Sequence, residues 1–135
     1  MANQRKFFQQ VRILDPFTSL DMMGDVLIDN HIIEEISPKI ELGVDDTAEV
    51  IDGNGLIFAP SLVDLYSCSG EPGYEERETL HSLGESALSG GFSRVGILPN
   101  TNPVIDNPNT VTWIQTQTQN YPVKFYLWGG LTRNL

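Results

Sequence analysis

The chain has 135 residues, of which 40% are hydrophobic and 19% are charged, a composition typical of about one globular domain. Eighteen Asp and Glu residues against eight Lys and Arg residues give a formal net charge of −10 at pH 7. Such a charge repels phosphate backbones and anionic membrane surfaces, so we expect neither a nucleic-acid partner nor a membrane partner.

The first ten residues carry two positive charges but contain no apolar segment and no small-residue cleavage site. No uncharged apolar run approaches the roughly 18 residues that a membrane-spanning helix needs. Cys68 is the only cysteine, which excludes an internal disulfide and suits a reducing compartment. We therefore expect a cytoplasmic protein that is neither secreted nor membrane-spanning.

Short β-strands are predicted in the first part of the chain, at residues 10–14, 24–28, 32–36 and 48–51. Turn-forming residues separate these apolar runs, which predicts a small antiparallel β unit. Asp29-Asn30-His31 lies between two β-branched runs, where a tight turn needs residues that tolerate a positive φ angle. We predict the tip of a hairpin there.

Strands and helices alternate in the second part of the chain. A short apolar run at residues 62–65 precedes a predicted helix at 74–89, whose apolar residues at helical spacing are Leu80, Leu83, Ala87 and Leu88. Gly90-Gly91 ends this helix. A strand at 94–98, a helix at 109–119 with Val111 and Ile114 inward, and a strand at 123–128 follow. This order predicts a parallel sheet whose two edges and much of whose apolar surface are left uncovered.

Several motifs follow one another between residues 50 and 103. They are Ala59-Pro60-Ser61, Asp64-Leu65-Tyr66-Ser67-Cys68, Glu71-Pro72-Gly73, Gly90-Gly91-Phe92 and Pro99-Asn100-Thr101-Asn102-Pro103. In this order they resemble the opening of dihydroorotases and of their hydantoinase and allantoinase relatives in the cyclic amidohydrolase superfamily. The resemblance covers nearly the whole chain, whereas any one motif alone, such as Gly-Gly-Phe, would be weak.

The resemblance implies an α/β fold. Residues 1–59 would form an amino-terminal segment of a small β-sandwich. Residues 60–135 would form the first three strands of an incomplete (β/α)8 barrel of the metal-dependent hydrolase (TIM) type. In this family the carboxylated lysine, further histidines and the catalytic aspartate come from later strands, so we expect the amino-terminal part of a longer chain.

The departure from the family falls on its metal ligands. Where the family has a His-x-His pair, this chain has Tyr66 and Cys68, and where it has a substrate-binding arginine, this chain has Gly70. A catalytic zinc needs about three protein ligands and an open position for water, and a phenol is a poor substitute for an imidazole. We therefore expect no catalytic residue, no metal ligand and no cofactor here, although active family members use zinc.

Other candidate residues have ordinary explanations. Cys68 could ligate a metal together with residues from outside this sequence, but a small, partly buried residue at a strand end is the simpler interpretation. His31 and His81 fall on a predicted turn and a predicted helix, and the glutamates before that helix suit its dipole. Asn100 matches a substrate-binding position of the family, and turn geometry explains it equally well.

Two functions of different classes remain open. The first is a dihydroorotase-like protein of pyrimidine biosynthesis without catalytic activity, a pseudoenzyme acting as a structural or assembly partner of aspartate carbamoyltransferase or of an active dihydroorotase. The second is a zinc-dependent cyclic amidohydrolase, acting on dihydroorotate or a related ring, whose altered metal site is completed by residues beyond this sequence. A weaker third is a binding module that uses Asn100 for a small acid. Homo-oligomers are compatible with all three.

Overall fold

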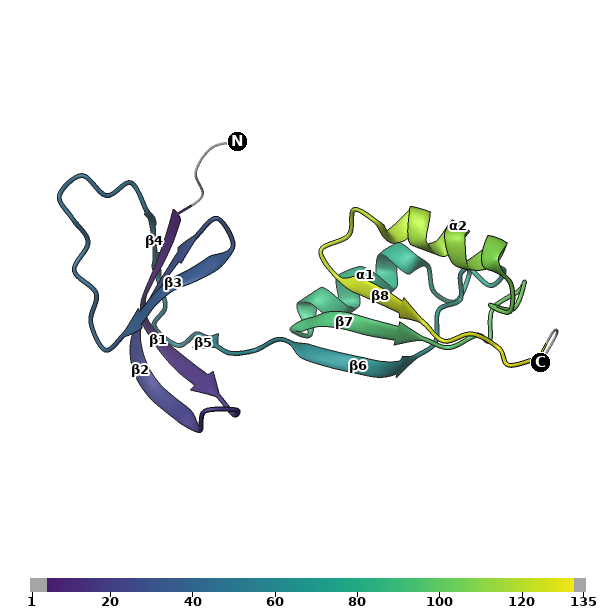
Figure 1. The fold of residues 1–135 in the computed structure, drawn as a ribbon, viewed down its shortest axis with the longest axis horizontal. Helices are drawn as coiled ribbons and strands as arrows, with labels where there is room; N and C mark the ends of the chain where they lie inside the picture. The colour runs from purple at the N-terminus through teal and green to yellow at the C-terminus, as the bar shows by residue number, and fades with distance from the viewer. Residues whose placement is uncertain (1–4, 133–135) are drawn as a thin grey trace. The chain divides into compact units, whose positions relative to one another are not determined.

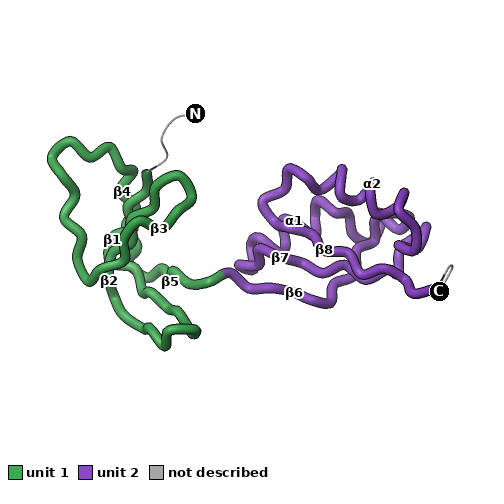
Figure 2. The backbone as a smooth tube through the Cα atoms, viewed as in Figure 1, with its two compact units in different colours: residues 1–60 green, residues 61–135 purple. Residues whose placement is uncertain are grey.

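A computed structural model describes residues 5–132, and the chain divides into two compact units, residues 1–60 and residues 61–135 (Figures 1 and 2). Each unit contains its own sheet, and helices occur only in the second unit among the described residues. The fold is therefore mixed α/β and rich in strands, as the sequence predicts.

The first unit is a five-stranded sheet. Its strands are β1 (Arg5–Asp15), β2 (Leu20–Asp29), β3 (Ile32–Ser37), β4 (Glu49–Asp52) and β5 (Ile57–Phe58). The order is β3-β2-β1-β4, with β5 also paired to β1. The prediction of a purely antiparallel unit was wrong, because β4 and β5 pair with β1 in parallel. The chain reaches β4 through the long loop 38–48, and only such a connection can bring a strand back in parallel.

The turn between β2 and β3 confirms the predicted hairpin tip. Asn30 and His31 both have positive φ angles, of 47° and 73°. Two consecutive residues in this region form the turn that matches the right-handed twist of a hairpin. Asparagine enters this region readily because its short side chain bonds locally, whereas histidine does so at a higher cost.

A buried carboxylate holds the irregular part of the first sheet together. The pairing of β1 with β2 shifts register between Phe8 and Val11, where Gln10 has a φ of 57°. Asp25 is 3% exposed and accepts hydrogen bonds of 2.9 Å from the backbone N–H groups of Gln10 and Ile40. The bulge and the loop 38–48 are thus fastened to the same side chain, and each oxygen of the buried carboxylate has a backbone donor.

The second unit confirms the predicted parallel sheet. Its elements are β6 (Leu62–Ser67), α1 (Leu80–Ser89), β7 (Phe92–Ile97), α2 (Pro108–Thr118) and β8 (Lys124–Leu127). The strand order is β6-β7-β8 and both pairings are parallel. Both helices lie on one side of the sheet (Figure 1). The core between them contains Leu80, Ala87, Val95, Ile97, Ile105, Ile114 and Val123.

Helix α1 begins later than the apolar spacing predicts, at Leu80 and not at Tyr74. Thr79 and Ser82 form a capping box, in which each side chain bonds the other residue's backbone N–H at 3.0 Å. The segment before Thr79 follows Pro72 and Gly73 and forms turns instead. The other end is as predicted, since Gly91 has a φ of 79° and lies just past the helix.

Candidate functional site

The residues at the family's metal and substrate positions lie together at the carboxyl ends of β6 and β7. Tyr66 and Cys68 stand at the end of β6, and Asn100 follows β7. The side-chain amide of Asn100 donates a hydrogen bond to the Cys68 sulfur at 3.2 Å. Tyr66 is 77% exposed, and Cys68 and Asn100 are also exposed. The prediction of a partly buried residue at Cys68 is therefore wrong, because Cys68 is exposed at this strand end.

Asp64 organises the end of β6. Its carboxylate accepts a hydrogen bond of 2.6 Å from the Ser67 hydroxyl and one of 2.9 Å from the Tyr66 backbone N–H. These two donors, the hydroxyl first, hold the pKa of Asp64 below its usual range. The carboxylate is therefore occupied in shaping the strand end and is not left free as a ligand.

Trp128 follows β8 and bridges back to β6. Its indole N–H donates to the Leu65 carbonyl oxygen at 2.9 Å, reaching from the end of β8 to β6. The ring crosses Gly96 of β7, where an added Cβ would stand 3.0 Å from the indole nitrogen. Trp128 was not predicted as a site residue. The alternation of residues 124, 126 and 128 on one face of a strand was the signal in the sequence.

The loops after β6 and β7 are joined to each other. The backbone N–H of Asn102 donates to the Pro72 carbonyl oxygen at 2.9 Å. Ser69 and Thr101, each less than 5% exposed, bond carbonyl oxygens of their own loops, at Glu71 and Pro103. The motifs that carry the family resemblance thus build the loop framework around the strand ends.

Gly70 occupies a position with no room for a side chain. A Cβ added there would overlap the carbonyl oxygens of Tyr74 and Glu78. The loop is closed tightly at this point, since the Tyr74 backbone N–H donates to the Gly70 carbonyl oxygen at 2.6 Å. An arginine at this position would require a different backbone path of residues 70–78. The observed loop conformation is therefore compatible with glycine and not with arginine at position 70.

The donors at this end of the sheet do not fit a zinc ion. Within residues 5–132, no three His, Cys, Asp or Glu side chains gather closely enough to hold a metal. His31 belongs to the hairpin of the first unit, and His81 lies on α1 with its ring edge-on to Tyr121 at 5.9 Å. The site offers one thiol, one phenol and one amide, of which only the thiol is a good zinc ligand.

The glutamates before α1 have structural partners. Glu71 accepts a hydrogen bond of 2.7 Å from the backbone N–H of Leu80, the first residue of the helix. Glu75 accepts one of 2.8 Å from the Gly73 N–H, and backbone donors lower its pKa. Only Glu71 contacts the amino terminus of α1, and the first turn of α1 contains no acidic residue, so the predicted placement of these glutamates in the first helical turn was wrong.

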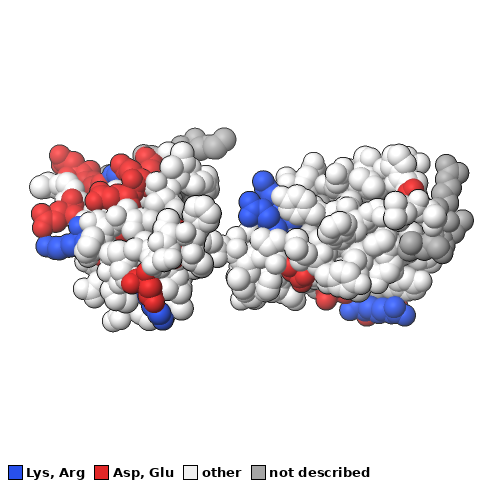
Figure 3. Space-filling view, turned by 60° about the horizontal axis from the view of Figure 1, so that its bottom comes forward, with Lys and Arg blue, Asp and Glu red and all other residues white. Residues whose placement is uncertain are grey.

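Charge is unevenly distributed over the two units. Acidic side chains gather on the first unit, whereas the visible face of the second unit is largely uncharged (Figure 3). On the side of the sheet away from α1 and α2, a shallow cavity of about 410 Å³ is lined by Val63, Leu65, Arg94, Gly96, Tyr126 and Trp128. Asp64 also lines this cavity, and apart from it and Arg94 the lining is aliphatic or aromatic.

Sequence comparisons place the chain among dihydroorotases. It is 45% identical over 106 residues to a probable dihydroorotase-like protein of Synechocystis, covering 78% of this chain and 24% of that protein. It is 36% identical over 129 residues to a dihydroorotase of Elusimicrobium minutum, covering 93% of this chain and 29% of that protein. The chain thus spans about a quarter of the length of these relatives. No protein-family model matches it.

Among solved structures, the chain resembles an L-hydantoinase (dihydropyrimidinase) from Arthrobacter aurescens. The TM-score is 0.75 at 22% identity, and the match covers 92% of this chain and 27% of the hydantoinase. This likeness shows a shared fold. The described residues include no helix that is both long enough and apolar enough to cross a membrane.

Proposed function

This chain is a relative of the dihydroorotases over most of its length, and on that premise we propose that it is a non-catalytic member of the family. Its role is structural: it holds together an assembly of pyrimidine biosynthesis. The partner is aspartate carbamoyltransferase or an active dihydroorotase. Because the chain covers about a quarter of the relatives it matches, activity and partner are assigned to the whole protein.

One observation carries this proposal. The framework motifs are kept and build the loops, while the two ligand positions hold Tyr66 and Cys68 and the arginine position holds Gly70. A hydrolase of this kind needs a metal to make water acidic enough to attack the ring. A protein with only a scaffold role needs the motifs that build the loops but does not need the metal-binding histidines.

The proposed architecture is the opening of an amidohydrolase. The three parallel strands of the second unit, each followed along the chain by a helix or a loop, are the first strands of a (β/α)8 barrel. The sheet of the first unit is part of a β-sandwich. The match to the hydantoinase over 92% of this chain supports both assignments.

In this proposal Asn100 is a remnant of the family's substrate-binding site and no longer binds substrate. Its amide already donates to Cys68, and no cation lies at position 70 to receive a carboxylate. A carboxylate that loses such a charge-assisted partner forfeits about 1.5–3 kcal/mol. Dihydroorotate should therefore bind weakly or not at all.

Two measurements on the purified protein test the proposed function. We expect no hydrolysis of dihydroorotate with or without added zinc, and we expect co-elution with aspartate carbamoyltransferase or an active dihydroorotase in size-exclusion chromatography. Turnover that a chelator abolishes would instead assign the protein as an enzyme with an altered metal site. Absence of co-elution with both partners would remove the structural role.

A further inference from the structure

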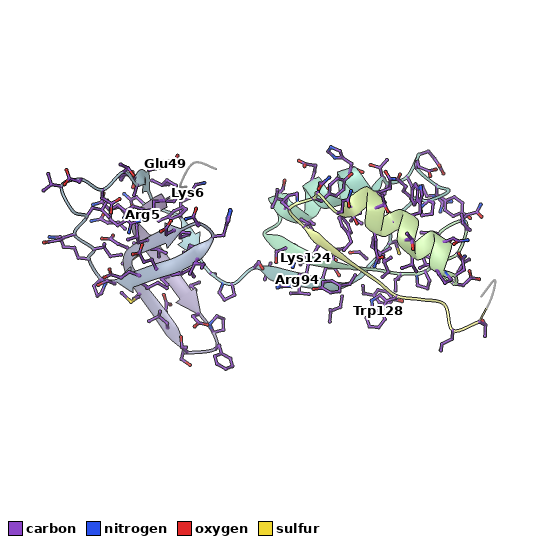
Figure 4. The ribbon with its side chains drawn as sticks, turned by 45° about the horizontal axis from the view of Figure 1, so that its top comes forward. Arg5, Lys6, Glu49, Arg94, Lys124 and Trp128 are labelled. Carbon is purple, nitrogen blue, oxygen red and sulfur yellow. The ribbon has the colours of Figure 1, made fainter. Side chains whose placement is uncertain are left out.

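The loop that joins β4 to β5 contains the only Asn-Gly step of the sequence, Asn54-Gly55. Both residues are exposed. Before the loop, β4 lies beside β1 with Glu49 opposite Lys6 (Figure 4), and after the loop β5 pairs with β1 as well. The loop therefore connects two short strands that are held by the same partner strand.

The two groups that make an asparagine chemically labile are both free here. An asparagine reacts when the backbone nitrogen of the next residue reaches its side-chain carbonyl carbon. Neither the Asn54 side-chain amide nor the Gly55 N–H bonds any residue between 5 and 132, whereas the Asn54 backbone N–H donates to the Asp52 carboxylate at 3.0 Å. Glycine has no Cβ that would hinder the approach of its nitrogen to the side chain.

The turn allows this approach. The Leu56 N–H donates to the Gly53 carbonyl oxygen at 2.8 Å and closes a turn with Asn54 and Gly55 at its centre, in which Gly55 has a φ of 80°. In a turn of this type II form, the central peptide group has to turn over before the Gly55 nitrogen faces the Asn54 side chain. That peptide group has no hydrogen bond within residues 5–132, and glycine adopts both signs of φ, so it can turn over while the closing bond persists.

The neighbouring Asp52-Gly53 step is protected. Gly53 is buried, its N–H donates to the Gln9 carbonyl oxygen at 2.7 Å, and an added Cβ there would stand 2.7 Å from the Val11 Cβ. Proline, which has no N–H, or a residue whose N–H is already bonded follows four other asparagines. These are Asn102, Asn107, Asn109 and Asn120.

We propose that Asn54-Gly55 is a site of spontaneous covalent modification by water. The Gly55 nitrogen attacks the side-chain carbonyl carbon of Asn54 and loses its proton, the bond to the side-chain amide nitrogen breaks, and ammonia leaves. Water then opens the resulting cyclic imide at either carbonyl, which gives aspartate or isoaspartate at position 54. The net change replaces ammonia by water, and nothing is oxidised or reduced.

Isoaspartate at position 54 loosens β5. The main chain of an isoaspartate runs through the side chain, so one carbon atom is added to the backbone between residues 54 and 55. The Leu56 carbonyl oxygen, which accepts the Arg12 N–H at 3.1 Å, lies directly before the two residues of β5 that pair with β1. A longer turn displaces this carbonyl and weakens the pairing. Aspartate keeps the backbone unchanged and adds only a negative charge.

A variant with a second Asn-Gly step tests the site. Asp52→Asn places the same chemistry at Gly53, whose N–H is bonded. Peptide mapping by mass spectrometry locates the products after incubation at mildly alkaline pH. We expect position 54 to convert at least about tenfold faster than position 52 in the folded variant, and the two rates to agree within about threefold in denaturant. Comparable conversion of both positions in the folded variant would overturn the proposal.

The wild type provides the second test of the site. Aspartate and isoaspartate should accumulate at position 54 of the folded wild type. Asn54→Gln should accumulate neither product there, because its longer side chain would have to close a larger ring. An unmodified Asn54 after prolonged incubation of the folded wild type would overturn the proposal.

Hydrogen exchange tests the effect on β5. The isoaspartate form, separated by anion exchange, should exchange its Arg12 amide hydrogen at least about threefold faster than the unmodified chain. Asn54→Asp is the matched control, because it has the added charge and an ordinary backbone, and it should exchange as the unmodified chain does. Equal exchange in the isoaspartate form and in this control would refute the loosening of β5. None of these measurements involves catalysis or a partner protein, so their failure would leave the proposed function as it stands.

Discussion

The backbone around Gly70 leaves no space for the arginine that the family has at this position. Its Cα faces the carbonyl oxygens of Tyr74 and Glu78 so closely that even a methyl group has no space. The sequence shows that the arginine is missing. It does not show that the backbone of residues 70–78 fills the space of the missing side chain. The contacts between residues 70 and 78 have no periodic pattern in the sequence.

Replacing Gly70 by alanine should therefore destabilise the second unit by about 1–3 kcal/mol or more, the usual cost of forcing extra volume into a packed site. Chemical denaturation measures the change in the free energy of unfolding. Gly43→Ala is a matched control, since an added Cβ there meets nothing within 4 Å, and it should change stability by less than about 0.5 kcal/mol. Equal effects of the two substitutions would contradict the loop geometry.

Asp64 should make stability depend on pH in the acid range. Its pKa is lowered in the folded chain by the Ser67 hydroxyl and the Tyr66 N–H, so its contribution is fully present above the unfolded pKa of about 3.9. The contribution is lost as pH falls through the lower, folded pKa. We predict that the stability difference between the wild type and Asp64→Asn shrinks below about pH 4.

The measurement is chemical denaturation of both proteins at a series of pH values. Other carboxylates with lowered pKa values, such as Asp15 and Asp21, titrate in both proteins and cancel in the difference. A difference that stays constant down to low pH would mean that Asp64 makes no such contacts.

At the scale of elements, the sequence predicts most strands and both helices, and the errors have physical causes. Apolar spacing from residue 74 onward suggested a longer α1, but spacing does not detect the Thr79 capping box that starts the helix at Leu80. Strand direction in the first unit was missed because parallel pairing with β1 depends on where the loop 38–48 leads. Local patterns contain no information about that path.

The capping box gives a prediction at this scale. Thr79→Ala removes the oxygen that accepts from the Ser82 N–H at 3.0 Å, and should lower the free energy of unfolding by about 0.5–2 kcal/mol. Thr112→Ala is the control, because Thr112 is an exposed residue within α2 and alanine favours a helix interior. The control should be neutral or slightly stabilising in thermal unfolding. A loss no larger than that of the control would mean that the box does not fix the start of α1.

The candidate site was only partly predictable. The positions of Tyr66, Cys68 and Asn100 at neighbouring strand ends follow from a parallel sheet, because carboxyl ends of adjacent strands meet at one edge. The bond from Asn100 to Cys68 and the reach of Trp128 to Leu65 do not follow, since they depend on side-chain rotamers.

At the scale of the whole molecule, charge and exposed apolar surface have different locations. The acidic residues that give the net charge of −10 gather largely on the first unit, and the uncovered apolar face lies on the sheet of the second. Negative charge repels other copies of the chain and so opposes association through the exposed apolar face. This distribution is compatible with the proposed role in an assembly.

The zinc affinity of the purified protein shows whether Tyr66 and Cys68 can replace the two imidazoles. Competition with a chromophoric chelator measures the affinity of the wild type and of a Tyr66→His, Cys68→His double variant that restores the two imidazoles. We predict that the wild type does not remove zinc from the chelator, whereas the double variant binds zinc measurably tighter. Stoichiometric zinc in the wild type that Cys68→Ser abolishes would contradict it.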